Sequence, residues 1–230
     1  DALARFGGDF WDLSERDVAL VPSPVAHIGG SLYAFEFPWT LGSTAVLMDS
    51  WSPERAVDLM EAEGVTFLAG ATPFLSGLLQ AARARGTTLP ALRRFVCGGA
   101  SVPPSLVEHA AAQFPGCVVS RAYGSTEVPI ICPGIRTRAD AAMGAATDGE
   151  CAADVLLLDE HDRPVAEGEV GEIVARAPRM FTGYLDPQDN AGAFTPGGHF
   201  RMGDLGRRVG GRFLELTGRK KDILIRLGEN

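Results

Sequence analysis

The sequence predicts an α/β fold: a largely parallel sheet covered by helices, followed by a small antiparallel β-barrel-like subdomain. Two observations predict it. Between Ser43 and Gly124, short β-branched runs alternate with segments of helical apolar periodicity, a pattern typical of parallel sheets. After about Ala139 the helical segments give way to short strands separated by turn residues. We therefore expect the organisation of the chain to change near residue 139.

The first region contains four expected strands and three expected helices. Ser52 and Thr72 are each followed by a proline, the pattern of a helix N-cap and first turn. Gly64 and Gly86 have the position of helix ends. The strands are expected at 44–48, 65–69, 94–97 and 118–122. The helices are expected at 53–63, 73–85 and 104–114.

The second region reads as a small antiparallel sheet or barrel between about Asp140 and Thr217. Its strands are expected at 154–159, 171–177, 206–209 and 212–216. The pair Gly210-Gly211 suits a tight hairpin between the last two strands.

Composition excludes several classes of protein. The chain has 230 residues and a net charge of −8, and its one basic run is Arg219-Lys220-Lys221, so nucleic acid is not expected as a main partner. No apolar run approaches the roughly 20 residues of a membrane span. The four cysteines form no CxxC pair, which disfavours a zinc site and favours reduced thiols in a cytoplasmic protein.

Unusual sequences follow three consecutive expected strands. They are Gly70-Ala71-Thr72, Gly98-Gly99-Ala100-Ser101 and Tyr123-Gly124-Ser125-Thr126-Glu127. Ligands of open α/β sheets bind beyond the carboxyl ends of the strands, and small residues there let a ligand approach the backbone. Tyr123 could stack on a base, the hydroxyls could bind phosphate, and Glu127 could hold magnesium. For each stretch taken alone, a turn between strand and helix is the favoured interpretation, but three converging strand ends favour a binding site.

Two further stretches lie in the second region. Asp204 follows a glycine and is expected ahead of a strand, where its carboxylate could accept both hydroxyls of a ribose. The stretch Gly218 to Asp222 is expected to follow the last strand. A solvated turn is the alternative for each.

These motifs, in this order, resemble successive signatures of the adenylate-forming superfamily. The superfamily comprises acyl-CoA synthetases, adenylation domains of peptide synthetases and beetle luciferases. The matching stretches are 123–127, 203–204 and 218–222, joined by Pro24 to Gly30, which resembles the acyl-pocket motif, and by Gly168 to Ile173 and Gly183-Tyr184, which resemble the barrel signature.

The resemblance implies a role for each matching residue. Tyr123 would stack near adenine against Gly98, Gly99 and Ala100. Thr126, with Gly124 and Ser125 beside it, would bind the α-phosphate, and Glu127 would hold magnesium as the metal ligand. Asp204 would bind the ribose hydroxyls, helped by Arg219.

Further implied roles concern the acyl group and the acceptor. His27 and Gly70 would line the acyl pocket, Lys221 would be the hinge of a carboxy-terminal domain, and Gly228 would lie beside the channel of coenzyme A. In family terms, residues 1–139 would be the second half of the large α/β subdomain, 140–217 the barrel subdomain, and 218–230 the hinge and the start of the carboxy-terminal domain. Residues 1–26 contain nothing like the family's phosphate loop, so we expect a central fragment, inactive alone, whose exposed apolar face permits self-association.

The activity implied is ATP-dependent activation of a carboxylic acid through an acyl-adenylate, followed by thioester formation with coenzyme A. The motifs look most like those of medium-chain or cyclohexanecarboxylate-CoA ligases. Two alternatives stay open: an adenylation domain that loads a carrier protein, and a non-catalytic, truncated nucleotide-binding or interaction module.

Overall fold

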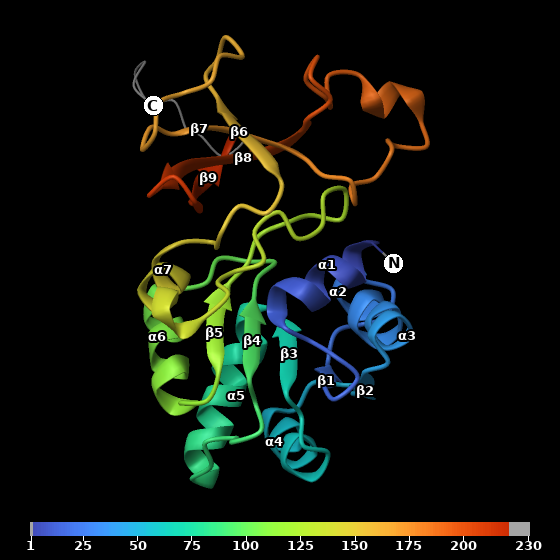
Figure 1. Cartoon of the computed structure of the whole chain (residues 1–230), viewed down its shortest axis with the longest axis vertical. Helices are drawn as coiled ribbons and strands as arrows, with labels where there is room; N and C mark the ends of the chain where they lie inside the picture. Colours follow the sequence, from blue (N-terminus) through green and yellow to red (C-terminus); the bar gives the residue numbers. More distant parts are fainter. Residues whose placement is uncertain (1, 221–230) are drawn as a thin grey trace.

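The computed structural model describes residues 2–220, which form two sheets joined end to end (Figure 1). The elements of the first part are α1 (Ala2–Trp11), β1 (Val18–Val21), α2 (Ile28–Ser31), η1 (Leu32–Glu36), α3 (Phe37–Leu41), β2 (Thr44–Leu47), α4 (Pro53–Ala62), β3 (Phe67–Gly70), α5 (Thr72–Arg85), β4 (Arg94–Cys97), α6 (Pro104–Gln113) and β5 (Val118–Arg121). Those that follow are η2 (Arg138–Asp140), α7 (Ala141–Ala146), β6 (Asp154–Leu158), β7 (Gly171–Arg176), η3 (Pro187–Asn190), β8 (Phe200–Val209) and β9 (Phe213–Arg219).

The first sheet has the strand order β2-β1-β3-β4-β5, and every neighbouring pair is parallel. The expected parallel sheet is therefore confirmed. Strand β1, which the sequence analysis did not assign, lies inside the sheet between β2 and β3. It is four residues long and precedes Ser43, where the alternation of strand and helix patterns begins.

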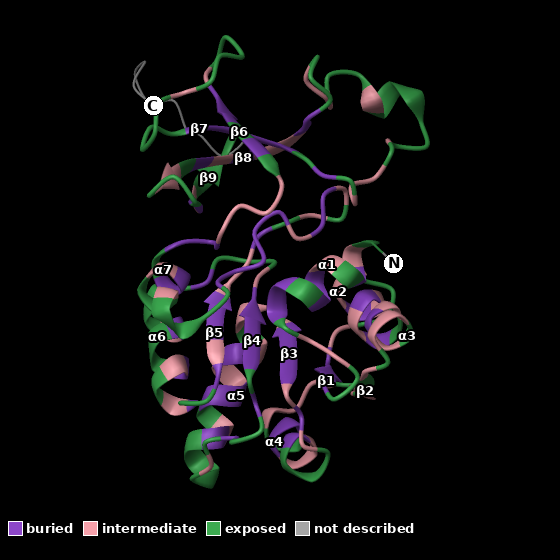
Figure 2. Cartoon of the chain, viewed as in Figure 1, coloured by how far each residue is buried: buried purple, intermediate pink, exposed green. Residues whose placement is uncertain are grey.

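Alternation along the strands separates two helical layers. Leu68 and Phe95 face the side covered by α4, α5, α6 and α7, whereas Phe67 and Val96 face α1, η1 and α3. Successive side chains of a strand point to opposite faces, so the central strands are buried on both faces, as Figure 2 shows for β3 and β4. Apolar strand runs follow from burial on two sides.

Most helix ends lie where the sequence predicts them. The hydroxyl of Ser52 accepts from the Arg55 amide as the N-cap of α4, and Gly86 ends α5 in the left-handed conformation with φ 74°. Thr72 differs from its expected role as an N-cap. The helix starts at Thr72 after Ala71, and the Thr72 hydroxyl instead donates to the carbonyl of Ser101 at 2.9 Å. It thus connects two of the strand-end sequences.

The second sheet is antiparallel, with the order β6-β7-β8-β9 and with β6 and β9 at its edges. The loop between β8 and β9 is residues 210–212, since Val209 pairs with Phe213. In it Gly210 and Gly211 have φ of 57° and 70°, a conformation that glycine adopts without steric cost. Two expected loop segments lie inside strands. Asp204 belongs to β8 and Arg219 to β9, where the two residues are paired.

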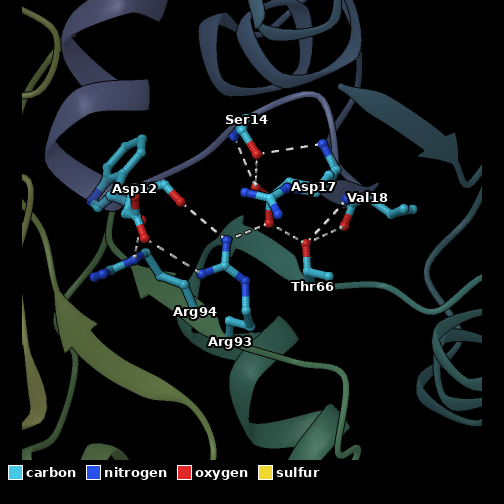
Figure 3. A network of polar contacts seen from close by, with 9 residues as sticks. Asp12, Ser14, Asp17, Val18, Thr66, Arg93 and Arg94 are labelled. Carbon is cyan, nitrogen blue, oxygen red and sulfur yellow. Dashed lines mark hydrogen bonds and ion pairs between the residues drawn. The ribbon is translucent and has the colours of Figure 1, made fainter. Parts of the chain in front are cut away.

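A polar network lies at the amino ends of β1, β3 and β4 (Figure 3). Asp17 accepts hydrogen bonds from the Thr66 hydroxyl and from Arg93 Nη2, both at 2.7 Å, and from the Ser14 amide at 2.8 Å. Beside it, the buried Arg94 donates to the carbonyl of Trp11 at 3.2 Å. These contacts attach the segment after α1 to β3 and β4.

The carboxyl ends of β3, β4 and β5 point toward the antiparallel sheet (Figure 1). Helix α7 packs on the parallel sheet, since Ala145 is buried in the core beneath α6. The domain boundaries expected at 139 and 217 stay predictions. Within residues 2–220, no helix is long and apolar enough to cross a membrane.

Candidate functional site

Two cavities open at the carboxyl ends of the parallel strands. The first, of about 950 Å³, lies between β5 and the strands β8 and β9. The second, of about 500 Å³, lies between the ends of β3 and β4 and the segment from His27 to Tyr33. Residues common to both linings are Gly99, Ala122, Tyr123, Gly124, Ser125, Glu127 and Arg219. The stretch after β5 is therefore the wall at which the two cavities meet.

Asp204 is one of two buried carboxylates in the first cavity, the other being Asp148. Its Oδ2 accepts a 2.7 Å hydrogen bond from the Tyr123 hydroxyl, and its Oδ1 lies 3.1 Å from Arg219 Nε. Burial, followed by the hydrogen bond to the Asp204 carboxylate, raises the pKa of Tyr123, so that its hydroxyl stays protonated and donates. Among residues 2–220 one donor is seen at each oxygen, and a carboxylate oxygen can accept a second.

Glu127 lies at the junction of the cavities. Its Oε1 accepts from the Tyr184 hydroxyl at 2.9 Å. Burial acts to raise the pKa of Glu127, but hydrogen bonds from its own amide, from Ser125 and from Tyr184 outweigh burial and lower it. Glu127 is thus ionised near neutral pH and carries a negative charge at this junction.

Glycines let the strand ends approach each other. A Cβ on Gly98 would lie 2.6 Å from the Ala122 carbonyl oxygen, and a Cβ on Gly124 would lie 2.6 Å from the Ile130 nitrogen. Both distances are shorter than contacts that a side chain tolerates. The backbone of the wall therefore requires glycine at these two positions.

The second cavity has mostly apolar and aromatic walls. Among its lining residues are Trp11, Leu32, Tyr33, Ala69, Gly70, Val96 and Ile130. His27 lies at its rim as the exposed N-cap of α2, where Nδ1 accepts from the Gly29 amide at 3.1 Å. Because Nδ1 accepts, the proton of a neutral His27 ring is on Nε2. This cavity suits an uncharged group.

A buried ion pair, not expected from the sequence, lies in the first cavity. Arg121 Nη2 donates to Asp148 Oδ1 at 2.6 Å, and Asp148 Oδ2 accepts from the Leu216 amide at 2.8 Å. Burial raises the pKa of Asp148 despite these contacts. Through Asp148, which lies between α7 and β6, these contacts connect Arg121 of β5 to Leu216 of β9.

The structure places most of the predicted site residues at one of the two cavities or at both. Tyr123, Gly99, Ala100, Asp204 and Arg219 line the first cavity. His27, Gly70, Gly98 and Thr126 line the second, so Gly98 lies on the other side of the wall from Ala100. Lys221 and Gly228 lie outside the described residues.

Sequence reasoning missed several lining residues. Arg121 precedes the Tyr123 motif on β5, and the rule that placed that motif at the strand end could have found it. Tyr184 was recognised only as part of a barrel signature, although it contacts Glu127. Asp148 and Trp11 carry no local signal, because only folding brings them to the cavities.

One carboxylate of the site is suited to magnesium. No group of three or more His, Cys, Asp or Glu side chains suited to a metal occurs in residues 2–220. Magnesium bound with a nucleotide commonly uses one or two carboxylates, waters and phosphate oxygens. Glu127, an ionised carboxylate at the junction of the two cavities, fits that requirement.

Comparison with known proteins agrees with the architecture. The family described as AMP-binding enzyme matches residues 2–185. The medium-chain fatty-acid–CoA ligase of Escherichia coli (strain K12) is 34% identical over 224 residues, covering 95% of this chain and 39% of that enzyme. A fatty acid–[acyl-carrier-protein] ligase of Streptomyces coeruleorubidus is 28% identical, with coverage of 100% and 45%.

Solved structures show the same fold. The O-succinylbenzoate coenzyme A synthetase of Bacillus subtilis, in complex with ATP and magnesium ion, superposes with a TM-score of 0.87 at 24% identity, covering 100% of this chain and 47% of that one. Fold and motif order together define a member of the adenylate-forming superfamily. The chain belongs to the AMP-binding enzyme family. It spans less than half the length of these relatives.

Proposed function

We propose that the protein activates a carboxylic acid with ATP and then forms its coenzyme A thioester. A carboxylate oxygen of the acid bonds to the α-phosphorus of ATP, and pyrophosphate leaves. The thiol sulfur then bonds to the acyl carbon, the thiol loses its proton, and AMP leaves. The single observation that carries the proposal is the shared wall 122–127, at which a polar cavity and an apolar cavity meet.

The first cavity would hold the nucleotide. Asp204 would accept the ribose hydroxyls with its carboxylate, and Arg219 would bind beside it. Tyr123 would form one wall of the adenine slot, opposite Gly99 and Ala100. This assignment is supported by the burial of Asp204, which two donors hold in one position.

The phosphate end would lie at the junction. Thr126 would donate a hydroxyl hydrogen bond to the α-phosphate, with Gly124 and Ser125 beside it, and Glu127 would hold magnesium through one carboxylate oxygen. When bound, the metal neutralises charge that develops on the phosphate oxygens. The residues of this chain then orient the α-phosphate toward the second cavity.

The second cavity would hold the acyl group, beside His27 and Gly70. Its volume of about 500 Å³ and its apolar walls support an uncharged acid of medium size, with six to ten carbons or a ring. The likeness to a medium-chain fatty-acid–CoA ligase supports the same class. A cytoplasmic location belongs to this proposal, as do the hinge at Lys221, the coenzyme A channel at Gly228 and self-association.

The second candidate is transfer to a carrier protein. It is favoured by the similarity to an enzyme named for an acyl-carrier-protein acceptor. A non-catalytic nucleotide-binding module remains the third candidate.

One experiment separates these candidates. The full-length protein is given ATP, magnesium, a panel of acids and either coenzyme A or a phosphopantetheinylated carrier protein. We expect acid-dependent pyrophosphate exchange and thioester formation on coenzyme A. Thioester on the carrier protein alone would favour the second candidate. AMP binding with no exchange for any acid would favour the third.

A further inference from the structure

The Tyr184 side chain contacts Glu127, the proposed metal ligand, from a distant part of the chain. Its hydroxyl donates to Glu127 Oε1 at 2.9 Å, although the two residues are 57 positions apart in the chain. Glu127 follows the parallel sheet, whereas Tyr184 lies in the segment between β7 and η3. The sequence motifs gave Tyr184 no role.

The loop that carries Tyr184 is held by one side chain. Asn190 Oδ1 accepts from the Tyr184 amide at 2.8 Å, and Asn190 Nδ2 donates to the carbonyls of Tyr184 at 3.0 Å and Asp186 at 3.3 Å. Gly183 has φ 140°, and a Cβ there would lie 2.9 Å from Asn190 Oδ1. Gly183 and Asn190 thus fix the backbone of Tyr184.

The ring and the neighbouring backbone are also held. The Tyr184 ring packs edge-on against Phe181, with centroids 5.0 Å apart, and lies 6.2 Å from the ring of Phe200. The Phe181 amide donates to the carbonyl of Glu127 at 2.8 Å. The loop therefore contacts Glu127 through both its backbone and its side chain.

We propose that Tyr184 is a positioning residue for Glu127. By donating to Oε1, its hydroxyl restricts the rotation of the carboxylate and so holds it in one orientation toward magnesium. The inference rests on the proposed function, in which Glu127 holds the metal. Groups that orient a metal ligand typically change metal affinity by about 10- to 100-fold when removed. Fixing one rotamer in advance also avoids an entropic cost on binding.

The test uses Tyr184→Phe in the full-length protein, since this change removes the hydroxyl and keeps the ring on Phe181. Calorimetry measures ATP binding over a range of magnesium concentrations and AMP binding without metal. We expect the magnesium concentration for half-maximal ATP binding to rise about 10-fold, with AMP affinity unchanged. In pyrophosphate exchange, the same shift in magnesium dependence should occur while kcat at saturating magnesium changes little.

Two further variants act on the same loop. Asn190→Ala keeps the Tyr184 hydroxyl but removes three hydrogen bonds to the loop backbone, two at Tyr184 and one at Asp186, so we expect a smaller shift in the same direction. Leu185→Ala is the matched control, because Leu185 is fully exposed and should leave the magnesium dependence unchanged. An unchanged magnesium dependence in Tyr184→Phe would overturn the proposal. So would an equal loss of metal-free AMP affinity, since that would show a general structural role.

Glu127→Gln separates this proposal from the function on which it rests. If Glu127→Gln leaves the magnesium dependence intact, the metal role of Glu127 fails, and the proposal for Tyr184 fails with it. If Glu127→Gln weakens magnesium and Tyr184→Phe does not, only the role of Tyr184 fails. If each single variant weakens magnesium binding, adding Tyr184→Phe to Glu127→Gln should produce no further shift in the magnesium dependence.

Discussion

Tyr123 donates its hydroxyl hydrogen to Asp204 Oδ2 at 2.7 Å and so joins the stretch after β5 to strand β8 across the first cavity. The two residues are 81 positions apart. With Arg219 at the other oxygen, Asp204 is a preorganised acceptor. Its position therefore depends on both sheets at once.

Asp204→Ala should weaken AMP binding. Hydrogen bonds to a charged group contribute about 1.5–3 kcal/mol, which corresponds to roughly 10- to 100-fold in Kd. Calorimetry with AMP measures the loss. In the unmutated protein, 2′,3′-dideoxy-AMP should show a similar loss, and equal binding of the two nucleotides would remove Asp204 from the ribose site.

Glu127→Gln should lower the rate of adenylation and leave the fold intact. One well-placed electrostatic contact to developing charge is worth about 3–4 kcal/mol, or roughly 100- to 1,000-fold in rate. Acid-dependent pyrophosphate exchange measures the rate, and the thermal midpoint checks the fold. Exchange close to the wild-type rate would show that Glu127 is not at the reacting phosphate.

Ala69→Leu should shift acid preference toward shorter chains. Ala69 lines the second cavity and is nearly buried, so the larger side chain occupies space proposed for the acyl group. Each methylene that can no longer be buried costs about 0.8 kcal/mol. The check is kcat/KM for a series of linear acids, in which the wild type should prefer six to ten carbons to acetate. Unchanged ranking in the variant would place the acyl group elsewhere.

Asp17→Ala should destabilise the protein most at neutral pH (Figure 3). Burial acts to raise the pKa of Asp17, but hydrogen bonds from Thr66, Arg93 and Ser14 outweigh it and lower the pKa below 3.8. Because the folded-state pKa is lower than the unfolded one, Asp17 stabilises the fold above pH 3.8 and loses this effect as pH falls through its folded pKa. We expect a loss of about 1–3 kcal/mol in free energy of unfolding at pH 7. Urea unfolding at pH 7 and pH 3 should show a smaller difference from wild type at pH 3; an equal difference at both values would exclude this cause.

Cys151 should be the first thiol to react with a disulfide reagent. The hydrogen bond with Cys132 lowers the pKa of Cys151, whereas burial raises the pKa of Cys97 and of Cys117 to about 12. The thiolate is the reactive form. The absorbance of the thiol released from the reagent at pH 8 should show one rapidly reacting cysteine, and Cys151→Ser should remove this fast phase. If the fast phase persists in Cys151→Ser, another cysteine is the reactive one.

The fold was predictable where local patterns and tertiary packing agree. Strand 94–97 and the capped helix after Ser52 match the structure, because turn residues bound each of them. Strand β1 escaped prediction because it precedes Ser43, where the alternation of strand and helix patterns that marked equally short strands such as 94–97 begins. Asp204 was expected in a loop, since Gly203 precedes it, yet β8 continues through Gly203 at φ 68°.

Only the part of the site that lies at the strand ends was predictable from the sequence. Three strand-end sequences gave the edge of the sheet and hence most of the wall between the cavities. Contacts across the two sheets, such as Tyr184 with Glu127 and Arg121 with Asp148, depend on how the sheets are placed relative to each other. No local pattern in the sequence encodes that placement.

The most direct test of the central claim is a crystal structure with a non-hydrolysable acyl-adenylate analogue that carries an eight-carbon chain. The account predicts adenosine in the first cavity with its ribose on Asp204, the acyl chain in the second cavity beside Ala69 and Val96, and the phosphate mimic at Ser125 to Glu127. An analogue bound with its acyl chain outside the second cavity, or with its ribose away from Asp204, would contradict it.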